Sequence, residues 1–145
     1  AVEKDLGYRY SSSVFPMRTP LYGYPGAPLN PYRPNGSGGE GENCLVEFPL
    51  TIYRGPLLSI PVCGGVYLRF LPLSLLSYLL KKVLEERPAV IYIHPRDIFP
   101  LDEVPGDIDA VTRFALFHGV KNALNRVEGL MDTFSFQTIR EVLSL

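Results

Sequence analysis

Residues 89–95, with the sequence AVIYIHP, constrain the fold of this 145-residue chain more than any other segment. The first five residues are all apolar and include three β-branched side chains, which is typical of a buried strand. The run ends abruptly at His94. Strands of α/β barrels place catalytic groups at their carboxyl ends, because the active sites of these folds lie at that face. We therefore predict a buried strand over residues 89–93 that delivers the His94 imidazole to a site.

Helical periodicity is clearest over about residues 73–86, where apolar side chains recur at helical spacing and Lys and Glu residues lie on the opposite face. The apolar stripe consists of Leu73, Leu76, Leu79, Leu80 and Val83. Pro88 ends this helix directly before the predicted strand. The same stripe with flanking lysines would also suit a membrane surface, but Glu85 and Glu86 balance the lysines and favour packing in a core.

Further helices are predicted over about residues 108–143, with a break at Gly119 and a short strand at 134–136. Thr138 and Glu141 match a capping box, which begins the last helix. Weaker alternation suggests short strands at residues 8–15 and 45–48. Alternating helices and strands indicate an α/β fold with largely buried strands.

The chain opens with AVEKDLGY, which reads as the last turns of a helix that has no beginning. Val2 and Leu6 share one face, and Gly7 occupies the position just past the helix end. We interpret residues 1–145 as the C-terminal portion of a larger domain. Half of such a domain would leave strand edges unpaired, so we expect either a homo-oligomer or an N-terminal half elsewhere.

A long irregular stretch covers about residues 17–44, where five prolines rule out regular structure. Loops of this length are usually functional or disordered. Tyr22, Tyr24 and Tyr32 lie among the prolines and either pack against them or offer aromatic platforms to sugar rings. We expect this tyrosine–proline part to be ordered and residues 35–43 to be mobile.

Composition excludes several classes of function. The formal net charge is −1, which leaves no electrostatic footprint for nucleic acid. The longest apolar stretch, residues 70–80, is interrupted by a proline and is too short to span a bilayer. Cys44 and Cys63 are too few for a zinc knuckle, and they are either two buried thiols or one disulfide.

Four segments together resemble the NodB-homology polysaccharide deacetylases, or carbohydrate esterase family 4, in the subgroup that carries a C-terminal extension. They are GYRYSSSVFP at 7–16, GGVYLRFLP at 64–72, IYIHPRD at 91–97 and the stretch 118–143. The resemblance implies the C-terminal part of a distorted (β/α) barrel that removes N-acetyl groups from amino-sugar polymers. It also implies a divalent metal, zinc or similar, held by one Asp and two His in motifs that this chain does not contain. We therefore expect this segment alone to be inactive and to hold no metal.

The resemblance assigns His94 to the last catalytic motif, where it would act as general acid. Imidazole titrates near neutral pH and can protonate a departing amine. The alternative is a half-buried histidine at a strand end, bonded to a neighbouring carbonyl. Asp97 is a candidate to orient the imidazole, and Arg96 and Asp97 could equally form a solvent-facing pair. His118, at a predicted helix end, is interpreted as structural.

Gly64 and Gly65 permit a positive φ or a close backbone approach, and Tyr67 and Arg69 follow them. This segment is either a sugar-binding wall, with Tyr67 stacking and Arg69 donating to hydroxyls, or a β-bulge with Arg69 anchoring the end of a helix. Both interpretations stay open.

Two departures from the family pattern motivate a second hypothesis. The family commonly has YDSS where this chain has Ser11 in place of the Asp, and HPWE where this chain has HPRD. Ser12 and Ser13 remain, and they either form a turn or provide hydrogen-bonding groups to the site. The leading hypothesis is a metal-dependent polysaccharide de-N-acetylase that acts on a poly- or oligosaccharide. The alternative is a non-catalytic carbohydrate-binding or assembly module on the same scaffold.

Overall fold

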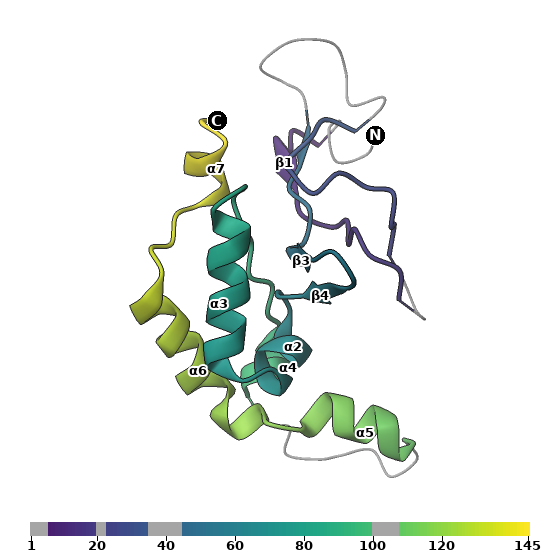
Figure 1. The fold of residues 1–145 in the computed structure, drawn as a ribbon. Helices are drawn as coiled ribbons and strands as arrows, with labels where there is room; N and C mark the ends of the chain where they lie inside the picture. Colours follow the sequence, from purple (N-terminus) through teal and green to yellow (C-terminus); the bar gives the residue numbers. More distant parts are fainter. Residues whose placement is uncertain (1–5, 20–22, 35–44, 100–107) are drawn as a thin grey trace.

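The computed structural model describes residues 6–19, 23–34, 45–99 and 108–145. Short strands and irregular segments from the N-terminal half lie on one side of the molecule, and α3 (Leu73–Leu84), α6 (Val120–Thr133) and α7 (Ile139–Val142) lie on the other (Figure 1). The short helices α2 (Gly65–Phe70) and α4 (Pro95–Ile98) lie beside each other between these two sides. The remaining helix is α5 (Ala110–Phe117).

The described strands form two sheets of two strands each. Strands β1 (Tyr10–Ser11) and β2 (Val46–Glu47) pair in parallel, with Tyr10 opposite Val46. Strands β3 (Ile52–Arg54) and β4 (Ser59–Pro61) form an antiparallel hairpin, with Ile52 opposite Pro61. Two sheets of this size do not decide whether the chain belongs to a closed barrel, so the barrel stays a prediction.

The main core lies between α3, α6 and the β3–β4 hairpin. Helix α3 buries Leu76, Leu79, Leu80 and Val83, so the predicted apolar stripe faces the core and Leu73 packs against it. Leu130 of α6 and Val62 after β4 complete the centre of the cluster. Full burial of each such side chain favours folding by about 1.5–3 kcal/mol, which makes this contact the main stabilisation of the helical side.

The strand predicted over residues 89–93 does not form. The segment is extended, and its alternation is real: Ala89, Ile91 and Ile93 pack partly buried against the core. The hydroxyl of Thr51 takes the place of a neighbouring strand at Val90, accepting from its N–H at 2.7 Å and donating to its C=O at 2.9 Å. Among the described residues, no strand lies alongside to extend this pairing, so the segment is half-buried rather than a buried strand.

The C-terminal helices α5, α6 and α7 form within the predicted range of 108–143. Gly119, in the left-handed conformation with φ 72°, separates α5 from α6. Thr138 and Glu141 form the predicted capping box. The strand predicted at residues 134–136 does not form, and the one at 8–15 shrinks to β1. Among the described residues, no helix is long and apolar enough to cross a membrane.

Parts of several predictions lie outside the described residues. These are the helical turns of residues 1–5, the loop segments 20–22 and 35–44, and Cys44. Residues 23–34 are irregular, as predicted, apart from one isolated bridge between Tyr32 and Glu47. Gly7 has a φ of 81°, a conformation that glycine adopts without strain.

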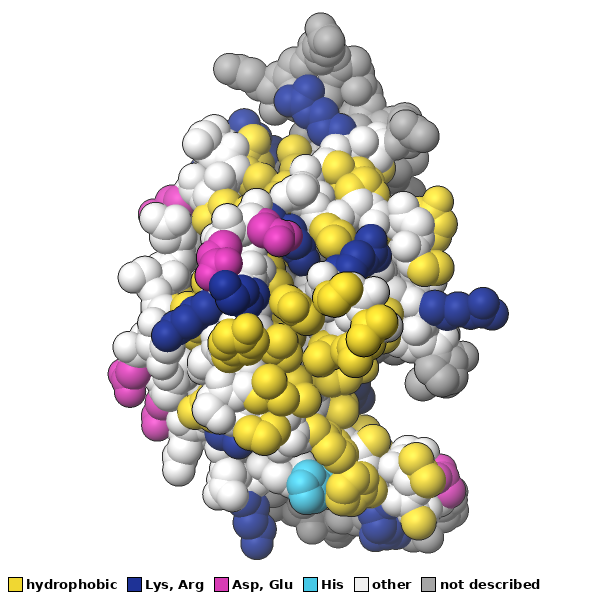
Figure 2. Space-filling view, viewed as in Figure 1, with side chains coloured by type: hydrophobic (Ala, Val, Ile, Leu, Met, Phe, Trp, Pro, Cys, Tyr) yellow, Lys and Arg dark blue, Asp and Glu magenta, His cyan; other side chains and the backbone are white. Residues whose placement is uncertain are grey.

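One face of the molecule carries a band of apolar side chains that runs from the β3–β4 hairpin past α3 toward α5 (Figure 2). Exposed apolar residues of these elements include Leu57, Tyr78 and Phe114. Exposed apolar patches of this kind usually mark contact surfaces. The predicted oligomer, or a further part of the protein, would cover such a band, and both stay predictions.

The assignment of the hydrophobic core is tested by truncating one leucine inside the core and one outside the core. Leu76→Ala should lower the free energy of unfolding by about 2–5 kcal/mol, because it leaves a cavity in the cluster around α3. Leu57→Ala, at a side chain that is 94% exposed, should change it by less than about 0.5 kcal/mol. Urea unfolding followed by circular dichroism measures both. Equal losses for the two variants would contradict the assigned core.

Candidate functional site

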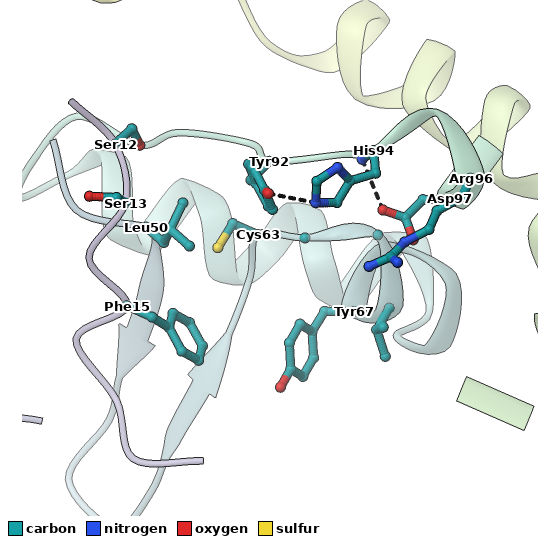
Figure 3. Close-up of a pocket in the computed structure, with 13 residues that line it drawn as sticks. Ser12, Ser13, Phe15, Leu50, Cys63, Tyr67, Tyr92, His94, Arg96 and Asp97 are labelled. Atoms are coloured by element: carbon teal, nitrogen blue, oxygen red, sulfur yellow. Dashed lines mark hydrogen bonds between the residues drawn. The ribbon is translucent and has the colours of Figure 1, made fainter. Parts of the chain in front are cut away.

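A cavity of about 470 Å³ lies where four segments that are distant in sequence meet (Figure 3). Its wall includes Ser12, Cys63, Tyr67, Tyr92, His94 and Arg96. A volume of this size is in the range of small-molecule sites. The cavity therefore brings together three of the sequence motifs singled out above: the serine turn, the paired glycines and the segment that ends in His94.

His94 stands at the edge of this cavity as an exposed side chain at the N-terminus of α4. Among the described residues, no backbone carbonyl bonds to its ring. Instead, the Tyr92 hydroxyl and His94 Nε2 are 2.5 Å apart, and the two rings meet edge to face at 4.8 Å (Figure 3). Residues two apart in an extended segment share a face, which explains this pairing. Tyr92 was missed in the sequence, although the period-2 alternation around His94 was enough to find it.

Asp97 holds the backbone of His94 rather than its ring. Oδ2 of Asp97 accepts from the His94 N–H at 2.9 Å, and Oδ1 accepts from Nη2 of Arg69 at 3.2 Å. The side chains of Arg69 and Asp97 are only 1% and 10% exposed, so this is a buried ion pair. Asp97 therefore does not orient the imidazole directly, and the solvent-facing pair of Arg96 with Asp97 is replaced by the pair with Arg69.

Arg69 is anchored by backbone carbonyls on all sides. Nε donates to Gly65 at 3.0 Å, and the terminal nitrogens donate to the carbonyls of Ala115, Leu116 and His118 at 2.9–3.0 Å. Burial lowers the pKa of the Arg69 guanidinium, and the Asp97 carboxylate opposes this shift. Of the two interpretations of Arg69, the structure thus supports the second: the guanidinium anchors the end of helix α5. It does not line the cavity.

Gly65 is required by the position of Asp97. A Cβ atom built on Gly65 would lie 1.9 Å from Cγ of Asp97, so only glycine lets this carboxyl group approach the backbone. Gly64 precedes α2 with a φ of 88°, a conformation that side chains rarely adopt. The paired glycines form the entry to a helix, not a β-bulge. Tyr67 and Arg96 both line the cavity wall.

The serine turn is organised by a carboxylate that the sequence did not point to. Glu47 is buried, and its Oε1 accepts from the N–H groups of Ser13 at 2.8 Å and Val14 at 2.7 Å. The Ser12 hydroxyl is buried beside the cavity and has no hydrogen-bond partner in the part of the chain that the structure describes. A lone carboxylate inside the apolar run of residues 45–48 was the available signal, since buried carboxylates are almost always bonded.

Comparison with known protein families shows to which family the chain belongs. Residues 12–144 match a protein family described as "Domain of unknown function (DUF3473)". The chain belongs to this family. No curated protein and no solved structure matches the DUF3473 chain.

Cys63 of this DUF3473 chain is a free, buried thiol in the cavity wall. Burial raises its pKa to about 12, so it stays protonated and unreactive at neutral pH. The described residues contain no group of three or more His, Cys, Asp or Glu side chains that could hold a metal ion. Asp97 is engaged by Arg69 and the His94 amide, so its carboxylate is not available as a metal ligand.

His118 lies away from the cavity wall, at the end of α5. Its ring stacks at 4.5–5.1 Å from the rings of Phe114 and Phe70. This arrangement agrees with the structural interpretation of His118, and it leaves His94 as the one histidine that the described chain offers to the cavity.

The close approach at Gly65 can be tested with one methyl group. Gly65→Ala should lower the free energy of unfolding by about 1–3 kcal/mol, because the Cβ overlaps the Asp97 carboxyl group. Gly26→Ala is the matched control, since a Cβ there meets only Tyr24 Cζ at 4.0 Å. Thermal unfolding compares the two. A Gly65→Ala protein as stable as Gly26→Ala would mean that Asp97 does not lie against this backbone.

Burial of Cys63 predicts a pH dependence. The thiol ionises near pH 9 when the chain is unfolded and near pH 12 when it is folded, so its stability contribution is complete below pH 9 and is lost as the pH rises toward 12. At pH 9, iodoacetamide should therefore modify Cys63 in urea but not in the folded protein. Mass spectrometry of the peptide containing Cys63 measures this. Equal modification rates in both states would contradict the burial.

Proposed function

We propose that this DUF3473 chain forms part of a polysaccharide de-N-acetylase in which His94 donates the proton to the departing amine. The observation that carries the proposal is the position of His94: an exposed imidazole on the edge of a 470 Å³ cavity, at the end of an extended segment. Two further points support it. The DUF3473 family is associated with polysaccharide deacetylases, and the four segments that resemble NodB-homology enzymes occur in order along the chain.

The proposed reaction is the hydrolysis of an acetamide. Water adds to the carbonyl carbon, the bond between that carbon and the sugar nitrogen breaks, and acetate and a free amine form. The nitrogen is a poor leaving group until it receives a proton, which His94 supplies. An imidazole is suited to this role because it gains and loses a proton near neutral pH. The hydrogen bond between Nε2 of His94 and the Tyr92 hydroxyl restrains the orientation of the ring.

The cavity wall supports a sugar as the substrate. Tyr67 offers an aromatic face, Arg96 offers guanidinium donors, and the Ser12 hydroxyl has no hydrogen-bond partner among the described residues. Sugar rings present apolar C–H faces and a periphery of hydroxyl groups, so they pair with this mixture of groups. Arg96 and Tyr67 thus take the role of substrate contacts in the proposal, while Arg69 and Asp97 take none.

The enzymes that the chain resembles use a divalent metal, such as zinc, which supplies Lewis-acid chemistry at the carbonyl. The described residues do not fit such an ion, so any metal would be held by other residues of the complete protein. The contribution proposed for this chain is limited to the proton donor and one wall of the substrate cavity.

A second function is favoured by the residues beside His94. Arg96 replaces the tryptophan of the family's usual HPWE, and Ser11 replaces the aspartate of YDSS. Arg96 lines the cavity together with His94, and its guanidinium offers several hydrogen-bond donors to the hydroxyl groups of a saccharide. Saccharide binding without turnover is therefore the competing proposal, a carbohydrate-binding module on the same scaffold.

The two proposals are separated by a histidine variant in the complete protein supplied with zinc. His94→Ala should lower kcat for acetate release from N-acetylated amino-sugar oligomers by about 10²–10⁴-fold, which is the usual value of a general acid. His118→Ala is the control, because that ring packs against phenylalanines outside the cavity, and it should retain kcat.

Unchanged turnover in His94→Ala would remove this residue from the mechanism. If the wild-type protein binds the oligomers in calorimetry but releases no acetate, the binding-module proposal replaces the enzymatic one.

A further inference from the structure

We propose that Arg69 and Asp97 are positioning residues for His94, and that they couple the place of His94 in the cavity to helix α5. The inference rests on the proposed function for its meaning in catalysis, but the coupling itself is a property of the fold. Neither side chain bonds to the imidazole in the hydrogen bonds found for the described residues, so both would act through the backbone on which it stands.

The first link runs from Asp97 to His94. Asp97 divides its two oxygens: Oδ2 binds the N–H of His94, and Oδ1 binds Arg69. The Asp97 N–H in turn donates to the His94 carbonyl at 2.8 Å, so both backbone polar groups of His94 are engaged by one residue. A backbone held at both groups cannot shift without breaking these bonds, and the imidazole shifts with it.

The second link keeps Asp97 in place. Its carboxyl group lies so close to Gly65 that no side chain fits there, and Arg69 reaches it while donating to the Gly65 carbonyl. Helix α2 therefore supplies both the wall against which Asp97 lies and the cation that binds it. Because the pair is buried, water cannot substitute for either partner.

The third link runs from Arg69 to α5. Helix α5 has no buried residue, and it is drawn out from the rest of the molecule in Figure 1. Its C-terminal end is held by the Arg69 guanidinium through the carbonyls of Ala115, Leu116 and His118. One guanidinium thus binds both the carboxylate that holds His94 and the end of this lightly packed helix. A displacement of α5 would therefore move the Arg69 guanidinium, which holds Asp97 and, through it, the backbone of His94.

Arg126 provides a matched control within the same structure. It also joins α2 to the C-terminal helices, since its guanidinium donates to the carbonyls of Leu68 and Leu71. It contacts neither Asp97 nor the His94 segment in any bond found for the described residues. Loss of either arginine removes hydrogen bonds at the end of a helix, but only the loss of Arg69 releases Asp97.

The experiment uses the complete protein with 13C-labelled histidine rings, in which the His94 signal is assigned by its loss in His94→Ala. In Arg69→Gln, the His94 ring signal should shift or split into several, and kcat should fall about 10²-fold with a small change in KM, as for a misplaced catalytic group. In Arg126→Gln, the His94 signal should stay in place and kcat should stay within about twofold of wild type.

Two further variants separate the links. Asp97→Asn keeps an oxygen for the His94 N–H and removes the charge that faces Arg69. The double variant Asp97→Asn with Arg69→Gln should lower kcat no more than the worse of the two single variants does. Arg69→Lys keeps a charge for Asp97 and loses the fork that binds α5. Its His94 signal should therefore shift less than in Arg69→Gln without returning to the wild-type position, and this variant serves if Arg69→Gln fails to fold.

The inference is overturned if folded Arg69→Gln or Arg69→Lys leaves the His94 signal as in wild type while α5 is released, or if Arg126→Gln moves it as much. A wild-type protein that releases no acetate would count against the proposed function alone, because the ring signals report on positioning without turnover.

Discussion

The buried ion pair between Arg69 and Asp97 is the contact on which the rest of the site depends. A buried pair of this kind contributes little net stability, since desolvation of two charges offsets their attraction. Removing one partner, however, typically costs about 3–5 kcal/mol, because the other charge is left buried. The pair therefore acts less as a source of stability than as a constraint: α2, α4 and the end of α5 must meet in one geometry for both charges to be satisfied.

A second buried carboxylate, beside another segment of the cavity wall, also holds backbone N–H groups in place. Glu47 binds the N–H groups of Ser13 and Val14, as Asp97 binds that of His94. On both sides, an irregular backbone segment at the cavity edge gains from a side-chain oxygen the hydrogen bond that a neighbouring strand would otherwise supply. Thr51 does the same at Val90. Short sheets thus suffice to place the cavity wall, because side chains satisfy the backbone where strands do not.

The sequence predicted α3, α5, α6 and α7 because their periodicity and caps are local, but it did not predict the short helices α2 and α4. The stripe on α3, the stop at Gly119 and the capping box at Thr138 all depend on residues within one or two turns. It also identified His94 as a residue at the edge of a cavity. The predictions from sequence failed where tertiary contacts determine the local structure. The segment 89–93 has the composition of a strand but meets Thr51 instead of a strand, and Asp97 meets Arg69, which is 28 residues away. Ser13 and Val14, the partners of Glu47, are likewise 34 and 33 residues away from it, whereas Tyr92 pairs with His94 two residues along the chain and could have been found from the local alternation.

The central claim is that the His94 imidazole faces a saccharide-binding cavity. The most direct measurement is a titration of the complete protein with an N-acetylated amino-sugar oligomer, followed by the ring resonances of its histidines and tyrosines. The account predicts saturable shifts of His94, Tyr92 and Tyr67, which line the cavity, and no shift of His118. Binding that leaves His94 and Tyr92 unmoved, or that shifts His118 instead, would contradict it.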